Sequence, residues 1–299
     1  MDKPQIIGLG LSGLIGTRIT ELLAYKFGFI KLGRSNGVDI TDKESLSAFK
    51  DYKDAKFVLH LAAKADVDGC EDDKSLGEEG EAWKINVIGT QNVADFCRNL
   101  GKKIIYISTD FVFDGSKNKG EKYGEDDIPN PINWYGRTKY EGEKAVEQSG
   151  SDYLILRLAY PYRASSDTKK DFFRTILESL ENRTEVKAVT DHKFSPTFID
   201  DIAFAIDALI KNNDAMGIYH VVGSDALTPY NASLKIAQVF GLDQNLIRET
   251  TREEFFANRA PRPFNLALRN DKIEKLGVKM RGFEEGLAEV KKQILGPHS

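Results

Sequence analysis

Cysteine is scarce in this chain, and long apolar runs are missing. Cys70 and Cys97 are the only cysteines among 299 residues, and their spacing suits neither a metal-binding pair nor a disulfide scaffold. We therefore expect free thiols, a cytoplasmic setting and no metal site. No apolar segment approaches the roughly 18 residues of a membrane-spanning helix. Because polar residues 1–5 lead directly into a short apolar strand, the sequence predicts neither a signal peptide nor a membrane span.

An excess of basic residues is also missing. The chain mixes 42 Lys and Arg residues with 46 Asp and Glu residues, which gives a net charge of −4. This pattern offers no basic face for a nucleic acid and no polybasic segment for an anionic membrane. The charge pattern therefore leaves small uncharged or anionic molecules as possible ligands. Since 41% of the residues are hydrophobic, the chain can bury its own core, and we expect a monomer or a homodimer.

Glycine, in contrast, occurs where a nucleotide fold needs it. A short apolar strand from Gln5 is followed by Gly10, Gly13 and Gly16 and then by a helical pattern up to Tyr25. Glycines at such a turn let the backbone approach a pyrophosphate, and the next helix offers free N–H groups and the positive end of its dipole. A glycine motif alone is weak evidence, since glycine turns join strands to helices in many folds. Its place on the first strand favours a dinucleotide site.

The second apolar strand, residues 29–32, ends just before Arg34 and Ser35. An acidic residue here would bind the adenosine ribose of NAD, whereas an arginine and a hydroxyl can bind the 2′-phosphate of NADP. The sequence therefore predicts NADPH as the preferred cofactor, with NADH as the alternative. Arg34 could equally be an ordinary solvated arginine. Asp39 is the next acidic candidate, in a loop that we expect to reach the adenine.

Residues 104–144 carry the candidate catalytic groups. An apolar strand ends at Thr109, and a loop leads from there to Tyr135 and Lys139. In a helix, the spacing of four residues puts the phenol and the ammonium on one face, one turn apart. A neighbouring ammonium stabilises a phenolate, so it should lower the tyrosine pKa from its ordinary value of about 10. With the Thr109 hydroxyl, these side chains supply a proton donor, the group that tunes it and an orienting hydroxyl.

Strands and helices alternate along the first half of the chain, which predicts an α/β fold with a doubly wound parallel sheet. Residues 1–160 are expected to form a nucleotide-binding domain. Residues 161–299 are expected to form mainly a smaller substrate-binding lobe, with some segments returning to the main sheet. The acidic residues 71–81 predict a solvated loop and helix start. We expect further strands at 57–61, 153–158 and 217–222, and one long helix at 81–100.

Several motifs, in this order, resemble the extended short-chain dehydrogenase/reductase family. The general motifs are Ser12-Gly13-Leu14-Ile15-Gly16, Val38-Asp39-Ile40-Thr41-Asp42, His60-Leu61-Ala62-Ala63, Ile85-Asn86-Val87 and Tyr135-Gly136-Arg137-Thr138-Lys139. Motifs similar to the dTDP-4-dehydrorhamnose reductase branch are Ser108-Thr109-Asp110-Phe111-Val112-Phe113-Asp114-Gly115, Ser195-Pro196-Thr197 and Pro261-Arg262-Pro263. The resemblance covers nearly the whole chain. It implies a Rossmann-type sheet and NAD(P)H-dependent reduction of a 4-keto-6-deoxy sugar nucleotide, as in dTDP-L-rhamnose biosynthesis.

The resemblance also implies roles for individual residues. Tyr135 would donate a proton to the carbonyl, Lys139 would bind the nicotinamide ribose and tune the phenol, and Thr109 would be the hydroxyl partner. The residues expected along the cofactor are Gly10, Ser12, Gly13, Leu14, Ile15, Gly16, Arg34, Ser35, Asp39, Ile40, Leu61, Ala62, Ala63, Lys64, Ser108, Tyr135 and Lys139. Those expected around the sugar nucleotide are Val67, Thr109, Asp110, Phe111, Tyr135, Tyr160 and Arg262.

The chain departs from this branch near the expected sugar. Phe111 stands where tyrosine is common, Tyr160 where tryptophan is common, and Lys64 where tyrosine is usual. Lost hydroxyls and altered rings can exchange one sugar for another, because unpaired polar groups discriminate strongly between substrates. The nucleotide base and the sugar configuration therefore stay open.

Two other functions also stay open. A sugar-nucleotide epimerase or dehydratase would use the same scaffold, and Asp110 beside Thr109 suits it, although dehydratases commonly have glutamate at the position of Phe111. A non-catalytic NADP-binding subunit, similar to the methionine adenosyltransferase regulatory beta subunit, belongs to a different class, since fold does not settle function. The intact set of Thr109, Tyr135 and Lys139 favours turnover.

Overall fold

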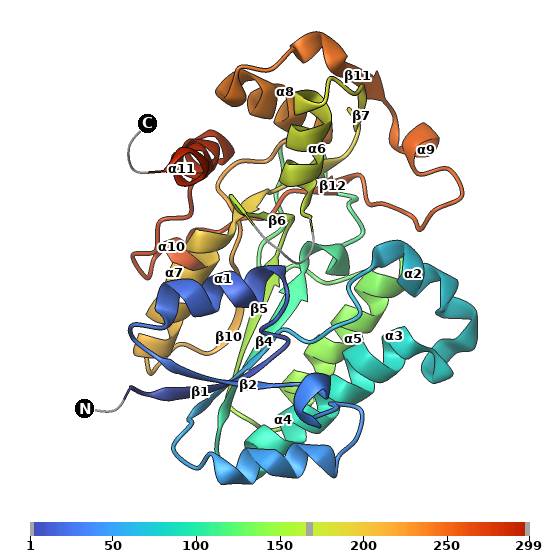
Figure 1. The fold of residues 1–299 in the computed structure, drawn as a ribbon. Helices are drawn as coiled ribbons and strands as arrows, with labels where there is room; N and C mark the ends of the chain where they lie inside the picture. The colour runs from blue at the N-terminus through green and yellow to red at the C-terminus, as the bar shows by residue number, and fades with distance from the viewer. Residues whose placement is uncertain (1–2, 166–169, 297–299) are drawn as a thin grey trace.

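A six-stranded parallel sheet forms the centre of the protein (Figure 1). The computed structural model describes residues 3–165 and 170–296. Across the sheet the strand order is β10-β5-β4-β3-β1-β2. This order confirms the predicted Rossmann-type doubly wound sheet. The strands are β1 (Gln5–Leu9), β2 (Gly28–Leu32), β3 (Phe57–His60), β4 (Lys103–Thr109), β5 (Tyr153–Leu158) and β10 (Gly217–His220).

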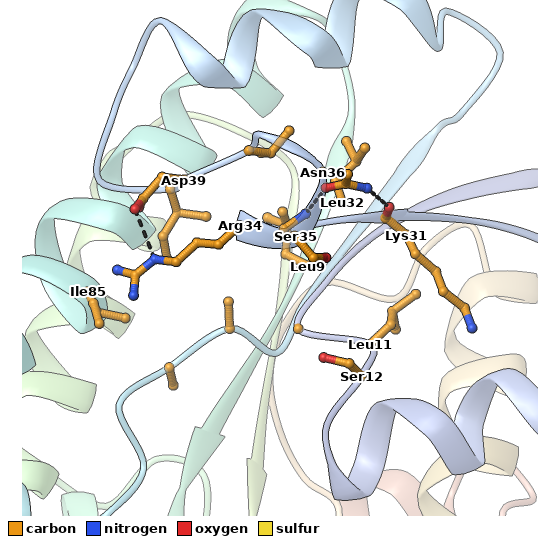
Figure 2. A pocket seen from close by; sticks show the side chains of 16 residues that line it. Leu9, Leu11, Ser12, Lys31, Leu32, Arg34, Ser35, Asn36, Asp39 and Ile85 are labelled. Atoms are coloured by element: carbon orange, nitrogen blue, oxygen red, sulfur yellow. Dashed lines mark hydrogen bonds and ion pairs between the residues drawn. The ribbon is translucent and has the colours of Figure 1, made fainter. Parts of the chain in front are cut away.

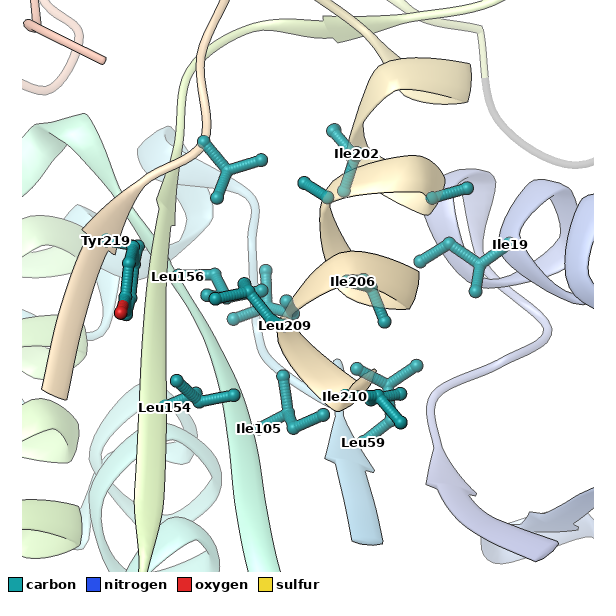
Figure 3. Close-up of a cluster of buried hydrophobic side chains, with 14 of the residues drawn as sticks. Ile19, Leu59, Ile105, Leu154, Leu156, Ile202, Ile206, Leu209, Ile210 and Tyr219 are labelled. Carbon is teal, nitrogen blue, oxygen red and sulfur yellow. The ribbon is translucent and has the colours of Figure 1, made fainter. Parts of the chain in front are cut away.

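Helices α1 (Leu14–Leu23) and α7 (Ile199–Lys211) cover one face of the sheet. Apolar residues recur along α7 at helical spacing, so one side of the helix can be buried against the strands. Ile206 of α7, Ile19 of α1 and Ile105 of β4 lie in one buried cluster (Figure 3). This packing brings a helix from the second half of the chain onto the main sheet.

The opposite face is covered by a long helical segment and by helix α5 (Trp134–Gln148). The sequence predicts one helix at 81–100. The structure instead gives α3 (Glu81–Trp83), a π-helical segment η4 (Lys84–Gly89) and α4 (Thr90–Asn99) in succession. A π-helical turn inside an α-helix often marks a functional site.

A second layer of elements lies beyond the carboxyl ends of the strands (Figure 1). Helices α6 (Phe172–Glu181), α8 (Pro229–Phe240) and α11 (Phe283–Leu295) pack together through buried aromatic and aliphatic side chains. Three short parallel strand pairs accompany them: β6 (Pro161–Tyr162) with β9 (Thr197–Phe198), β7 (Val186–Val189) with β11 (Ile247–Thr250), and β8 (Lys193–Phe194) with β12 (Asn265–Leu266).

The remaining elements are short. They are the helices α2 (Val67–Asp72), α9 (Arg252–Phe255) and α10 (Asp271–Glu274), and the 3-10 helices η1 (Arg34–Asn36), η2 (Ser45–Asp51), η3 (Lys74–Glu79), η5 (Asp110–Val112) and η6 (Gln244–Leu246). In the ranges 3–165 and 170–296, no helix has both the length and the apolar composition needed to cross a membrane. Met1 and Asp2, which begin the polar segment discussed above, lie outside these ranges.

Candidate functional site

The carboxyl end of β4 meets the amino end of α5. Asn133 caps α5, because its side-chain oxygen accepts a backbone N–H of the first helical turn at 2.8 Å. The cap fixes where the helix begins, so Tyr135 and Lys139 fall one turn apart. Thr109, the last residue of β4, lies near the Tyr135 phenol, while its hydroxyl donates to the carboxylate of Asp110 at 3.0 Å. The fold thus brings these three side chains together from two elements.

Lys139 is almost fully enclosed. Its ammonium donates to the carbonyl oxygen of Ile107 at 2.7 Å and lies 4.1 Å from the centre of the Tyr106 ring. Burial lowers the pKa of Lys139 to about 7, and the charge of Glu143 opposes this shift. Lys139 can therefore exist in both its charged and its neutral form near neutral pH.

The pKa of Tyr135 moves in the direction opposite to the prediction. Burial raises the pKa of the phenol, and the nearby Thr109 hydroxyl only partly opposes this shift. The sequence argument used the charge of Lys139, but it could not include the desolvation of the phenol. Tyr135 is consequently protonated at neutral pH and is available as a proton donor.

A buried ion pair lies behind Lys139. The guanidinium of Arg157 donates twice to the carboxylate of Glu143, at 2.9 and 2.7 Å. Ser108, which pairs with Arg157 across the strands, donates its hydroxyl to the same carboxylate at 2.5 Å. The Ser108 hydroxyl, expected along the cofactor, is thus engaged with Glu143. Sequence reasoning missed this pair, although a glutamate one turn after Lys139 and an arginine inside an apolar strand were visible signals.

Asp110 is a buried acid without full hydrogen bonding. One carboxylate oxygen receives the Thr109 hydroxyl at 3.0 Å, whereas the other has no hydrogen-bond partner within the described part of the chain. Burial raises the pKa of Asp110 to about 7. The side chain lies next to the predicted proton donor and can donate or accept a hydrogen bond there.

Apolar and aromatic side chains expected around the sugar form one cluster. The ring centre of Phe111 lies 5.8 Å from that of Tyr135 and 6.4 Å from that of Tyr160. Val67, at the start of α2, packs against the same group. The structure therefore gathers these four residues, which are far apart in the sequence, beside Asp110.

Arg262 lies at the edge of this cluster. Its guanidinium donates to a carboxylate oxygen of Asp68 at 2.8 Å and to the Ala260 carbonyl at 2.6 Å. Asn133, the cap of α5, donates to the Pro261 carbonyl at 2.9 Å. These bonds hold residues 260–263 against α2 and against the start of the helix that carries Tyr135.

The acidic stretch at residues 71–81 is not simply a solvated loop and helix start, as the sequence predicts. Glu71 accepts the backbone N–H of Trp134 at 2.7 Å, and Asp73 accepts that of Ala82 at 2.5 Å. Both carboxylates therefore bind free N–H groups in the first turns of helices, which the charge pattern alone does not reveal.

Asn86 lies in the π-helical segment and is fully buried. Its carboxamide accepts the backbone N–H of Lys64 at 2.9 Å and donates to the carbonyl of the same residue at 3.0 Å. It also donates to the Thr138 hydroxyl at 3.0 Å. Asn86 thus joins the segment after β3 to α5, while the Lys64 ammonium pairs with Glu81 at 2.9 Å.

A cleft of about 480 Å³ opens at the carboxyl ends of β1 and β2 (Figure 2). Eight of the residues expected along the cofactor line it: Gly10, Ser12, Arg34, Ser35, Asp39, Ile40, Ala62 and Ala63. The remaining lining residues were not predicted to bind the cofactor: Leu9, Leu11, Lys31, Leu32, Gly33, Asn36, Val38 and Ile85. The other expected residues do not line this cleft: Gly13, Leu14, Ile15, Gly16, Leu61, Lys64, Ser108, Tyr135 and Lys139.

The glycines beside this cleft have different roles. Gly10 has a φ of +76°, and a Cβ atom there would lie 2.6 Å from the Ala62 nitrogen. A Cβ atom at Gly16 would lie 2.5 Å from Leu11, so both glycines serve close packing within the protein. Gly13 has more open space and precedes α1, whose amino end no side chain within the described residues caps. This helix end fits a pyrophosphate.

The far end of the cleft is exposed. The Arg34 guanidinium donates to Asp39 at 2.9 Å, and its side chain is 62% exposed (Figure 2). Hydrogen bonds from Thr41, together with the charge of Arg34, hold the pKa of Asp39 below its ordinary value. Asn36 closes the turn between these residues by accepting the Gly33 N–H at 2.7 Å. An arginine and an ionised carboxylate therefore lie side by side where the adenosine is expected.

The chain is similar to several known proteins over nearly its whole length. The chain is 31% identical to the spore coat polysaccharide biosynthesis protein SpsK of Bacillus subtilis, over 97% of this chain and 96% of SpsK. It is 32% identical to methionine adenosyltransferase 2 subunit beta of Xenopus laevis, over 94% of this chain and 85% of that protein. A crystal structure of dTDP-4-dehydrorhamnose reductase from Bacillus anthracis, in complex with NADP, superposes with a TM-score of 0.87 at 29% identity, covering 98% of this chain and all of that one.

One match spans nearly the whole molecule. Residues 4–295 match the family described as the RmlD substrate binding domain. The match includes β1, the strand β4 that ends at Thr109, and the segment that carries Arg262. This chain belongs to the RmlD substrate binding domain family.

Proposed function

We propose that this protein is an NADPH-dependent reductase of a 4-keto-6-deoxy sugar nucleotide, similar to dTDP-4-dehydrorhamnose reductase. The observation that carries the proposal is the enclosed set of Thr109, Tyr135 and Lys139 at the carboxyl end of β4. A protonated phenol, a hydroxyl near it and a lysine one turn further along the same helix are the groups that reduction of a carbonyl requires.

The residues at the cleft fit a dinucleotide. The uncapped amino end of α1 offers N–H groups to a pyrophosphate, and Arg34 offers a cation to a 2′-phosphate. The Bacillus anthracis reductase, which this chain resembles over nearly its whole length, was solved with NADP. We therefore favour NADPH, with NADH as the alternative. The UDP-glucose 4-epimerase of Thermus thermophilus, which was solved with NAD, is 21% identical to this chain, so it supports only the fold.

The chain's own residues divide the work of the reaction. When bound, NADPH supplies the hydride that reduces the keto carbon. Thr109 and Tyr135 hold the keto oxygen, and Tyr135 transfers its proton to that oxygen as negative charge develops there. Lys139 orients the ribose beside them and, in its charged form, stabilises the phenolate that remains. Val67, Phe111 and Tyr160 enclose the sugar.

A non-catalytic subunit is the second candidate, because the subunit beta from Xenopus laevis is 32% identical over 94% of this chain. Such a subunit would bind the cofactor without turning it over. The proton donor argues for the reductase, since binding alone does not need a protonated phenol near a hydroxyl at this place.

NADPH oxidation separates these candidates. The purified protein is mixed with NADPH and with dTDP-, UDP- and GDP-linked 4-keto-6-deoxy sugars, and the nicotinamide absorbance is followed. We expect oxidation with at least one sugar and an equal amount of reduced sugar. Tight NADPH binding without oxidation of any sugar would support the regulatory subunit. Conversion of the sugar without net NADPH oxidation would indicate an epimerase or a dehydratase.

We also propose a cytoplasmic protein that is a monomer or a homodimer and has no nucleic acid or membrane partner. Cys70 and Cys97 are free and buried, which suits a reducing compartment. Light scattering at several concentrations measures the mass in solution. A mass larger than two chains would contradict this part of the proposal.

A further inference from the structure

Tyr160 occupies an unusual position next to the predicted sugar pocket. It lies two residues after the end of β5, and its φ of +41° is uncommon for a residue with a side chain. Its ring packs against Phe194, with 4.3 Å between the ring centres, and faces Phe111 at 6.4 Å. A strained backbone persists only where surrounding contacts hold it, and such residues cluster at functional sites.

The hydroxyl of Tyr160 is tied to a histidine from a distant segment. The Tyr160 oxygen lies 3.1 Å from Nε2 of His192, and Nδ1 of the same ring lies 2.7 Å from the Pro263 carbonyl oxygen. His192 is 1% exposed, whereas Tyr160 is half-buried. The three groups form a hydrogen-bonded chain from the Pro263 carbonyl through His192 to the Tyr160 hydroxyl.

The direction of each hydrogen bond follows from its partners. A carbonyl oxygen can only accept, so Nδ1 of His192 must carry the hydrogen. Burial lowers the pKa of His192 to about 4, so the ring is neutral at physiological pH and Nε2 is an acceptor. The Tyr160 hydroxyl must then donate its only hydrogen to Nε2. Its oxygen retains lone pairs but has no hydrogen left to give.

We propose that His192 is a positioning residue that fixes the Tyr160 phenol as a hydrogen-bond acceptor for a hydroxyl group of the bound sugar. The inference rests on the proposed function, because it takes the ligand to be a sugar nucleotide. A sugar with a hydroxyl group facing the Tyr160 oxygen can donate to it. A sugar with a keto or ether oxygen there would place two acceptors against each other, without a hydrogen bond. This arrangement discriminates against the wrong sugar through an unpaired polar group.

The same chain connects the sugar pocket with residues 260–263. Pro263 follows Arg262, which is bonded to Asp68, and Pro261 is bonded to the cap of α5. The orientation of Tyr160 is therefore set by a segment that also contacts the start of the catalytic helix. A tyrosine at this position without the histidine could rotate its hydroxyl to donate or to accept.

The hydrogen positions can be tested without any substrate. Nitrogen-15 NMR of the folded protein with labelled histidine distinguishes an Nδ1–H ring from an Nε2–H ring. We expect His192 to be neutral with its hydrogen on Nδ1, and we expect Tyr160→Phe to shift the Nε2 signal. A hydrogen on Nε2 in the wild type would overturn the inference, whatever the substrate proves to be.

The role in binding is tested with two probes, dTDP-L-rhamnose and dTDP, by calorimetry. Tyr160→Phe should weaken the binding of dTDP-L-rhamnose about three- to tenfold, which is the usual contribution of one hydrogen bond. The affinity for dTDP should stay within about twofold of the wild type. His192→Leu should weaken the binding of the sugar nucleotide to the same extent. His192→Gln should recover much of the loss, because its amide oxygen can accept from Tyr160.

Three results separate the possible failures. Equal losses for dTDP-L-rhamnose and dTDP would show that the variants only disturb the structure, which would overturn the inference. Full affinity in Tyr160→Phe would overturn it as well. If the wild type binds dTDP but not dTDP-L-rhamnose, the proposed function fails in its sugar, and the NMR result alone decides how Tyr160 is oriented.

Discussion

The two ends of the predicted cofactor site differ in their surroundings. The catalytic end, formed by Thr109, Tyr135 and Lys139, is enclosed, and burial shifts the pKa values of its tyrosine and its lysine. The adenosine end, formed by Arg34 and Asp39, is exposed, and a surface ion pair holds it together. Enclosure determines proton affinity at the first end, whereas water screens the charges at the second. We therefore expect large effects of substitutions at the catalytic end and small effects at the adenosine end.

The largest effect should come from the proton donor. Tyr135→Phe should reduce turnover about 10²- to 10⁴-fold, the usual worth of a positioned acid, while NADPH binding is retained. Single-turnover NADPH oxidation measures the loss with a keto sugar nucleotide that the wild type accepts. Tyr25→Phe, at a tyrosine that is 67% exposed, is the matched control and should stay near wild-type turnover. Wild-type turnover in Tyr135→Phe would mean that the proton comes from another group.

The buried pair behind Lys139 should matter next. Glu143→Gln leaves the Arg157 guanidinium buried without its counter-charge, so the free energy of unfolding should fall by about 3 to 5 kcal/mol. Glu185→Gln removes one partner of the exposed pair with Arg248 and should cost about 1 kcal/mol or less. Denaturant unfolding of both variants measures the difference. Similar losses of unfolding free energy in the two variants would contradict the expected difference between enclosed and exposed charges.

The buried acid Asp110 should make stability depend on pH. Its pKa is about 7 in the folded protein and ordinarily near 3.8, so between these values the folded state binds more protons than the unfolded state. Stability from this group is therefore present below about pH 4 and lost as the pH rises through 7, by up to about 4 kcal/mol. Asp110→Asn should remove this slope. Parallel unfolding curves for wild type and variant from pH 4 to 8 would contradict the raised pKa.

The smallest effect should occur at the adenosine end. Arg34→Ala should weaken the binding of NADPH about tenfold and change the binding of NADH little. A charge-assisted bond to the 2′-phosphate is worth about 1.5 to 3 kcal/mol before screening. The nearby Asp39 carboxylate reduces the gain by repelling the phosphate. Fluorescence titration with both cofactors measures the ratio. Equal losses for the two would show that Arg34 does not read the phosphate.

Much of the architecture is visible in local patterns. All six strands of the central sheet were predicted, and the bounds given for them lie within about two residues of the observed ones. The spacing of Tyr135 and Lys139 predicts one helix face, because the helical period of 3.6 residues is a local property. The helix α11 was not predicted. The two-residue strands were not predicted either, since strands of this length carry too little pattern. The division of the chain near residue 160 stays a prediction.

The sequence by itself determined the succession of strands and helices along the chain, the glycine turn and the one-turn spacing of Tyr135 and Lys139, because each depends on neighbours in the chain. Only the tertiary structure decided the proton affinities, because enclosure by distant segments raises the pKa of Tyr135 and lowers that of Lys139. It also decided the partners of Tyr160, since His192 and Pro263 come from segments that no local period connects. Hydrogen-bond direction and desolvation depend on three-dimensional contacts, and a linear pattern does not specify them.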